Sequence, residues 1–146
     1  MIRSYRDLAV WRRAVNACIV VYRMTSNFPP EERFGITSQL RRAAVSIPSN
    51  IAEGHERNGR KEFLAHVHVA RGELAEVETQ LTIARALGYA GEAQLASVMD
   101  EYSRIGRMLT RLAQRLRPVP KSRVPVPPEA PGPRPQPPPL RSPSPP

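Results

Sequence analysis

The pattern of apolar and polar positions predicts four amphipathic helices in the first 117 residues of this 146-residue chain. Apolar residues recur there at alternating steps of three and four, which is the spacing of one buried helical face. The expected helices span residues 5–27, 31–53, 60–88 and 92–117. No useful length alternates with period two, so strands are not expected. We therefore predict an all-α fold, an antiparallel up-down four-helix bundle.

Each predicted helix has a candidate core face. The third helix has the most regular one, which comprises Phe63, Val67, Ala70, Leu74, Val77, Leu81 and Ala84. The same spacing in the fourth selects Leu95, Val98, Tyr102, Ile105, Leu109, Leu112 and Leu116. In the first helix it selects Leu8, Trp11, Val15, Cys18, Tyr22 and Thr25. Ser4 and Asp7 have the spacing of a capping box at its start.

The second helix has a proline inside its apolar pattern, which consists of Leu40, Ala44, Ile47 and Ile51. Pro48 has no amide hydrogen to donate, and its ring crowds a carbonyl of the preceding turn. We therefore expect a kink or a break, at a cost of about 3 kcal/mol. The short polar side chains of Ser46, Ser49 and Asn50 are suited to satisfying freed backbone groups or bonding to a neighbouring helix. Gly54 is the expected stop of this helix.

The composition changes after Arg117. Fourteen of the seventeen prolines lie in residues 118–146, together with four basic residues and one acidic residue. Such a segment cannot recover its ordering entropy by burying apolar surface, so we predict a disordered, basic tail with polyproline II character. The tail lacks a complete proline-rich motif for an aromatic groove, which favours a basic tether over a ligand of that kind.

The net charge of +9 favours polyanionic partners, either nucleic acid or an acidic protein surface. Two groups of basic residues are candidates for contacts with phosphate. One group precedes and begins the third helix, where unpaired amides favour anions, and consists of Arg57, Arg60 and Lys61. The other is a stripe on the fourth helix, Arg104, Arg107, Arg111 and Arg115. A solvated loop and a solvated or interface stripe are the alternatives, and an arginine-rich composition is also consistent with genomic base composition.

Catalytic and metal-binding patterns are not found in the sequence. The single cysteine, Cys18, excludes an intramolecular disulfide and indicates a reducing compartment. None of the three histidines has the Glu-x-x-His spacing of a dinuclear carboxylate bundle. No apolar run approaches the roughly 20 residues of a membrane span, and the first residues lack the apolar core of a signal peptide. We expect a cytoplasmic protein without catalytic residues, metal or cofactor.

One segment identifies a family. The sequence SIPSNIAEG at 46–54, preceded by QLRRAAV and followed by Glu62 and Phe63, resembles the signature of a four-helix bundle family often encoded within intervening sequences of bacterial 23S ribosomal RNA genes. DLAVW at 7–11 and FPPEERFGITSQL at 28–40 fit the same family, over roughly residues 5–116. The signature residues are Arg41, Arg42, Ser46, Pro48, Ser49, Asn50, Glu53 and Gly54. A half-buried arginine at 41 or 42 is expected to pair with Glu53 or with carbonyls at a helix C-terminus.

This family is similar to the accessory protein of diversity-generating retroelements, a basic pentameric ring that engages nucleic acid and a reverse transcriptase. The resemblance implies a homo-oligomer, a pentamer, with no established enzymatic activity. The resulting hypothesis is a non-enzymatic bundle that binds nucleic acid, with structured RNA as the favoured ligand, through backbone contacts. The alternative is a protein-binding scaffold whose arginines serve subunit or partner interfaces, with a reverse transcriptase as a partner implied by the weaker resemblance.

Overall fold

The computed structural model describes residues 1–120 and residue 132. It contains four α-helices, α1 (Ala9–Thr25), α2 (Ile36–Glu56), α3 (Arg60–Ala86) and α4 (Glu92–Leu116). Short 3-10 helices, η1 (Tyr5–Asp7) and η2 (Pro30–Glu32), precede α1 and α2. None of these described residues forms a strand. The predicted disordered tail lies outside the described residues, apart from 118–120 and 132.

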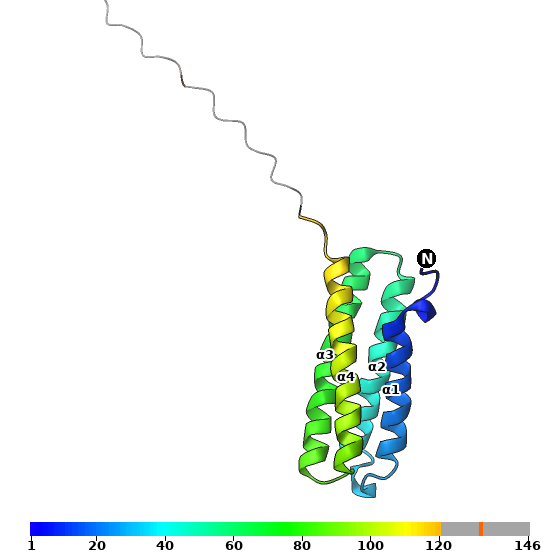
Figure 1. Ribbon diagram of the computed structural model, residues 1–146, viewed down its shortest axis with the longest axis vertical. Coiled ribbons are helices and arrows are strands. Elements are labelled where there is room, and N and C mark those ends of the chain that lie inside the picture. The colour runs from blue at the N-terminus through cyan, green and yellow to red at the C-terminus, as the bar shows by residue number, and fades with distance from the viewer. Residues whose placement is uncertain (121–131, 133–146) are drawn as a thin grey trace, which may run out of the picture.

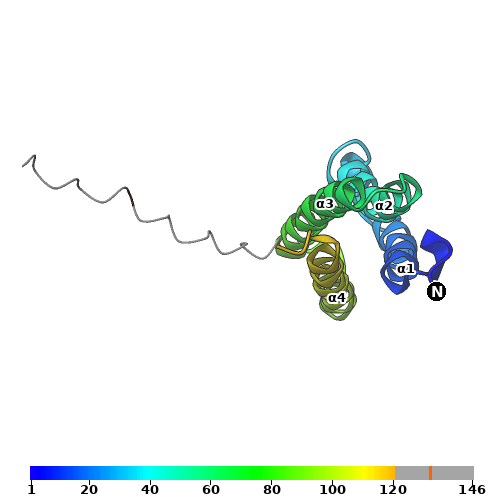
Figure 2. The same ribbon diagram turned by 90° about the horizontal axis from the view of Figure 1, so that it is seen from above.

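The helices run alternately down and up the molecule, so the predicted antiparallel up-down bundle is confirmed (Figure 1). The 27 residues of α3 give it a length of about 40 Å. Viewed along the bundle, α2 and α3 lie close together, whereas α1 and α4 are further apart (Figure 2). The bundle therefore has one tight and one looser seam between neighbouring helices.

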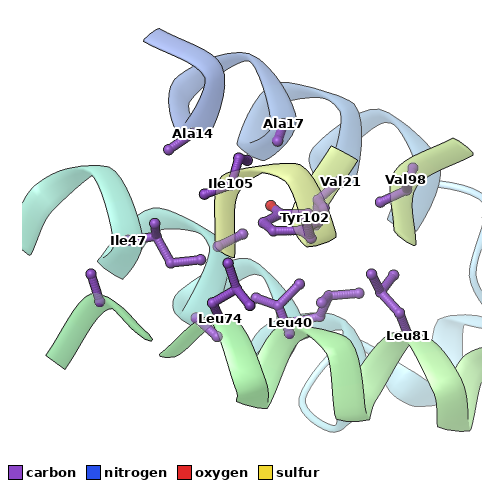
Figure 3. Close-up of a cluster of buried hydrophobic side chains, with 14 of the residues drawn as sticks. Ala14, Ala17, Val21, Leu40, Ile47, Leu74, Leu81, Val98, Tyr102 and Ile105 are labelled. Carbon is purple, nitrogen blue, oxygen red and sulfur yellow. The ribbon is translucent and has the colours of Figure 1, made fainter. Parts of the chain in front are cut away.

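The core lies along the bundle axis. The predicted faces of α3 and α4 are confirmed over most of their length, from Val67 to Ala84 and from Leu95 to Leu109. Phe63, Leu112 and Leu116 are only partly buried, at the end of the bundle where α3 begins and α4 ends. Tyr102 lies in the middle of the cluster of buried side chains (Figure 3).

The predicted core face of α1 is wrong. Apart from Leu8 and Thr25, the buried residues in this part of the chain are Val10, Ala14, Ala17, Val21 and Met24. This helix has two adjoining apolar stripes, and the bundle buries the one with alanines because small side chains let α1 approach its neighbours. Trp11 is partly buried with its ring centroid 5.2 Å from that of Tyr5, and Tyr22 is 43% exposed.

The starts of α1 and α2 differ from the predicted boundaries. The Ser4–Asp7 capping box is confirmed, but it begins η1, and α1 starts at Ala9. The amides of Arg3 and Ser4 donate to Asp7 and lower the pKa of its carboxyl group. Helix α2 begins at Ile36 rather than at residue 31, because Glu32 Oε2 accepts a hydrogen bond from the Ile36 amide (3.1 Å).

Helix α2 continues without a break through Pro48, which is buried. The side chains around it bond to the backbone of the same helix. Ser49 Oγ donates to the carbonyl of Val45 (2.9 Å), and Asn50 Nδ2 donates to the carbonyl (2.9 Å) and hydroxyl (3.0 Å) of Ser46. These bonds supply polar contacts in the region where proline removes one from the helix.

Gly54 does not end α2, so this boundary was predicted wrongly. The helix ends at Glu56, and Asn58 then adopts the left-handed conformation (φ 55°) that reverses the chain. Gly54 is buried against α3, where an added Cβ atom would lie 2.6 Å from the Cβ of His66. Glycine at this position therefore allows α2 and α3 to approach closely.

Polar contacts also join α2 to α3. Nδ1 of His66 lies 3.1 Å from Oδ1 of Asn50, so Nδ1 is assigned as the donor. Arg42 pairs with Glu76 and lies 3.6 Å from the carboxylate of Glu73. This seam is therefore specified by both close packing and directional contacts.

The seam between α1 and α4 has fewer polar contacts. Nη1 of Arg13 donates to both carboxylate oxygens of Glu101, at 2.8 and 3.1 Å. Beside this pair is a hollow of about 250 Å³ whose lining includes Ala17 and Val98. Tyr102 is fully buried, its hydroxyl has no hydrogen-bond partner among the described residues, and burial raises its pKa.

Candidate nucleic-acid interface

Members of both predicted basic groups meet at one end of the bundle. The loop after α2, the first turn of α3 and the last turn of α4 all lie at this end (Figure 1). Nη2 of Arg60 donates to the backbone carbonyl of Arg115, which links the start of α3 to the end of α4. We term this region the basic end, and it comprises Arg57, Arg60, Lys61, Arg111 and Arg115.

The side chains of the basic end differ in their bonding. Arg57 pairs with Glu53 at 2.8 Å, and both side chains are about half exposed, so water screens the pair. None of the ion pairs within residues 1–120 involves Lys61, Arg111 or Arg115. All three are exposed. Their charges are therefore available to an external anion.

A groove between α3 and α4 extends from the basic end. It has a volume of about 580 Å³, and its lining includes Arg71, Arg107 and Arg111. Its floor contains Leu74 and Gly106, and a Cβ atom at Gly106 would lie 3.5 Å from Leu74. We term it the α3–α4 groove. It places three guanidinium groups and one carboxylate, that of Glu78, along one depression. Positive charge therefore predominates there, which suits a row of phosphates.

Arg71 was not predicted as a site residue. It lies opposite Arg107 because α3 and α4 form an antiparallel pair about the turn that contains Gly88, and residues equally distant from such a turn meet. Residues 71 and 107 are equally far from residue 89. Counting outward from the predicted turn would have found Arg71, whereas the spacing within one helix could not.

The predicted arginine stripe of α4 is exposed along its whole length, but its four members have different surroundings. Arg107 and Arg111 line the α3–α4 groove. Arg104 lies 3.9 Å from Glu101, the same carboxylate that binds Arg13. Arg104 therefore faces a local acidic group, and Arg107 and Arg111 are the members best placed for a phosphate.

The signature arginines, Arg41 and Arg42, lie away from the basic end. Nη2 of Arg41 donates to the carbonyl of Tyr22 (3.2 Å) in the last turn of α1, and its Nε donates to Oγ1 of Thr25 (2.8 Å). Such a contact with the carbonyl end of a helix is electrostatically favourable. Glu53 instead pairs with Arg57. The signature segment thus supports the bundle through contacts with α1 and α3.

Other site chemistries have little support in the described part of the chain. Residues 1–120 and 132 contain no group of three or more His, Cys, Asp or Glu side chains placed to hold a metal ion. Burial raises the pKa of the Cys18 thiol, which lowers its thiolate fraction at neutral pH. None of the described helices is long and apolar enough to cross a membrane.

The fold and the surface define a basic four-helix bundle without a recognisable catalytic centre in its described residues. The model of the 23S rRNA-intervening sequence protein family matches residues 6–111, so the chain belongs to that family and the resemblance is confirmed. A solved structure of a protein with unknown function, from the S23 ribosomal protein family of Bacteroides thetaiotaomicron, is similar at 21% identity with a TM-score of 0.66. The similarity covers 73% of this chain and 99% of that chain. No curated protein matches the sequence.

Proposed function

We propose that this chain is a non-enzymatic, homo-oligomeric bundle that binds structured RNA through its sugar–phosphate backbone. The observation that carries the proposal is the continuity of the basic end with the α3–α4 groove, whose arginines form no ion pair within residues 1–120. Planar guanidinium groups bind phosphate in a bidentate manner, and contacts of this kind do not read base sequence. Membership of a family named for 23S ribosomal RNA intervening sequences agrees with an RNA ligand. Such a protein would act in the cytoplasm.

The test is a salt titration of binding to an RNA duplex. We expect the affinity to fall steeply with salt. Neutralising Arg107 or Arg111 with glutamine should reduce the slope of log K against log salt by about 1 for each phosphate that is no longer bound. Arg23→Gln is the matched control, because Arg23 is exposed on α1 and forms no ion pair within residues 1–120. Equal reductions in all three variants would show that net charge alone acts. Absence of binding at low salt would refute the proposal.

The homo-oligomer is proposed from the second apolar stripe of α1. This stripe includes Val15, Cys18 and Ile19, and Ile19 is 44% exposed. Because the apolar surface of α1 extends beyond the face that the bundle buries, a second copy is the proposed cover of this stripe. The number of five subunits comes from the resemblance to the retroelement accessory protein.

Light scattering tests the assembly. We expect the wild-type mass to exceed that of one chain, and Ile19→Glu to lower it. Val69→Glu is the matched control, because Val69 is exposed to a similar extent (48%) on α3. A monomeric wild type would refute the oligomer, and dissociation by both variants would show that the contact is not specific to α1.

A protein-binding scaffold is the second candidate function. It is favoured by the number of arginines already paired with carboxylates, including Arg13, Arg42 and Arg85. These paired charges are less available to phosphate, and a surface of mixed charge suits a complementary protein surface. The resemblance suggests a reverse transcriptase as one such partner. Failure to bind RNA at low salt, combined with an intact oligomer, would favour this function.

A further inference from the structure

A second surface lies at the end of the bundle opposite the basic end, where α1 finishes and α2 begins (Figure 1). It contains a hollow of about 390 Å³. Two aromatic rings, three guanidinium groups and a threonine hydroxyl contribute to its lining, from Tyr22, Phe34, Arg33, Arg41, Arg42 and Thr37. We term it the aromatic pocket. None of its residues belongs to the basic end or to the α3–α4 groove.

Phe34 is the most unusual member of the aromatic pocket. Its side chain is 87% exposed, although a phenylalanine ring gains free energy by leaving water. The guanidinium carbon of Arg33 lies 5.3 Å from the centroid of this ring. An exposed aromatic ring beside an arginine is the pair of groups that stacks on a nucleobase and binds the adjoining phosphate.

Thr37 provides an independent indication of a ligand. It lines the pocket, is only 8% exposed, and its hydroxyl forms no hydrogen bond with any other described residue. A buried hydroxyl without a partner costs free energy. A polar ligand in the pocket, with a small adjustment of the threonine rotamer, would supply the missing bond.

The three arginines of the pocket have different roles. Arg42 is neutralised by Glu73 and Glu76 on α3. Arg41 is held by Thr25 and the carbonyl of Tyr22, and its guanidinium carbon lies 4.7 Å from the centroid of the Tyr22 ring. Arg33 forms no ion pair within residues 1–120. Arg33 and the fixed Arg41 are thus the cations available to a phosphate.

Neither Glu31 nor Glu32 forms an ion pair with Arg33 or Arg41 within residues 1–120. Glu32 has both carboxylate oxygens engaged, one by the amide of Ile36 and the other by the hydroxyl of Tyr89 (3.1 Å). Glu32 occupies the first amide of α2, and its negative charge beside this helix N-terminus disfavours a second anion there. The phosphate contact falls instead to the guanidinium groups of Arg33 and Arg41.

We propose that the aromatic pocket binds one unpaired nucleotide of an RNA strand, with the base stacked on Phe34 and a phosphate held by Arg33 and Arg41. This inference rests on the proposed RNA-binding function and specifies single-stranded RNA as a ligand class at this end. The basic end and the α3–α4 groove have few aromatic groups. In the proposed function they bind the sugar–phosphate backbone of RNA, whether it is duplex or single-stranded. The two surfaces together fit an RNA that has both a duplex and an unpaired segment.

The experiment compares two fluorescent probes, a short oligouridylate single strand and a blunt RNA duplex, on the full chain. We expect Phe34→Leu to weaken binding of the single strand about tenfold, because one base no longer stacks on a ring, and to leave binding of the duplex unchanged. Phe34→Tyr, which keeps an aromatic ring, should bind both probes as the wild type does. Arg107→Gln should weaken binding of both probes.

The outcomes separate this inference from the proposed function. If the wild type binds the duplex with steep salt dependence but Phe34→Leu binds the single strand normally, the aromatic pocket is not a nucleotide site, and the proposed function survives. If the wild type binds neither probe, the proposed function fails and the inference fails with it. If Phe34→Leu lowers the assembled mass in light scattering, the ring is a subunit contact and the inference is wrong.

Discussion

The seam between α2 and α3 and the seam between α1 and α4 are built differently within one bundle. The first combines a glycine at closest approach with a bond between Asn50 and His66. The second has a hollow of about 250 Å³, one ion pair between Arg13 and Glu101, and a buried hydroxyl without a partner among the described residues. A close contact at glycine and directional hydrogen bonds fix the register of two helices relative to each other. Apolar side chains alone can pack in several arrangements. The comparison indicates that α2 and α3 fix the geometry of the fold.

The largest expected effect comes from filling the closest contact of the α2–α3 seam. We expect Gly54→Ala to lower the free energy of unfolding by about 2 kcal/mol, because its Cβ would lie 2.6 Å from that of His66. Gly72→Ala is the matched control, since nothing lies within 4 Å of its added Cβ, and alanine should stabilise that helix by about 0.5–1 kcal/mol. Urea unfolding measures the free energy of unfolding of both variants. Changes of the same sign in the two variants would contradict the close contact at Gly54.

A smaller effect is expected when the directional bond of the same seam is removed. Asn50→Ala should cost about 1 kcal/mol, because it removes bonds to Ser46 and leaves the half-buried His66 without its acceptor. Ser49→Ala is the control, since its hydroxyl is exposed and bonds only within its own helix. A double-mutant cycle with His66→Ala checks the pair, and zero coupling energy would refute the contact.

The ion pair of the α1–α4 seam should contribute less. We expect Arg13→Met to lower the free energy of unfolding by about 0.5 kcal/mol, because both side chains are 30–40% exposed and screened by water. This destabilisation should shrink in concentrated salt. Urea unfolding at low and high salt measures it. A destabilisation as large as that of Gly54→Ala would show that the two seams are equally tight.

The smallest effect is expected at the unpartnered hydroxyl of Tyr102. Tyr102→Phe should change the free energy of unfolding by less than about 0.5 kcal/mol near neutral pH, because it removes no hydrogen bond within the described residues. Burial raises the pKa of Tyr102, so the folded wild type should lose stability as the pH rises above about 10, the range where the unfolded tyrosine ionises.

Tyr102→Phe lacks this ionisable group, so its stability should fall less at alkaline pH. Unfolding by urea at neutral and alkaline pH compares the two proteins. Parallel declines with pH in both proteins would show that burial does not raise the pKa of Tyr102. A large destabilisation at neutral pH would show that the hydroxyl has a partner.

Helix number, helix order and three of the core faces could be predicted, because the repeats of α2, α3 and α4 each have a single apolar stripe. The predicted face of α2, which comprises Leu40, Ala44, Ile47 and Ile51, is fully buried. The face of α1 could not be predicted, since its two stripes differ mainly in side-chain size and the choice depends on the neighbouring helices. The start of α2 depends on the capping contact from Glu32, which lies outside the helix that it caps. Gly54 was assigned to a helix end because its contact with α3 is not encoded in local spacing.

In the candidate site, too, some residues could be predicted from the sequence and others could not. Basic residues on one helix, such as Arg107 and Arg111, could be selected from their spacing. Arg71 required the register between α3 and α4. The aromatic pocket required the end of α1 to meet the start of α2, where Tyr22 contacts Arg41. Local periodicity therefore finds the members of a surface that share one helix, and misses those joined by the tertiary fold.

The even number of helices has a practical consequence for experiments. Residue 1, the loop after α2 and the last turn of α4 lie at the same end, and the turn that contains Gly88 lies at the other (Figure 1). Immobilising the protein through either end of the helical region would place the basic end against the support. A label or anchor inserted at the turn around Gly88 would leave that end open to solution, and would shield the aromatic pocket instead.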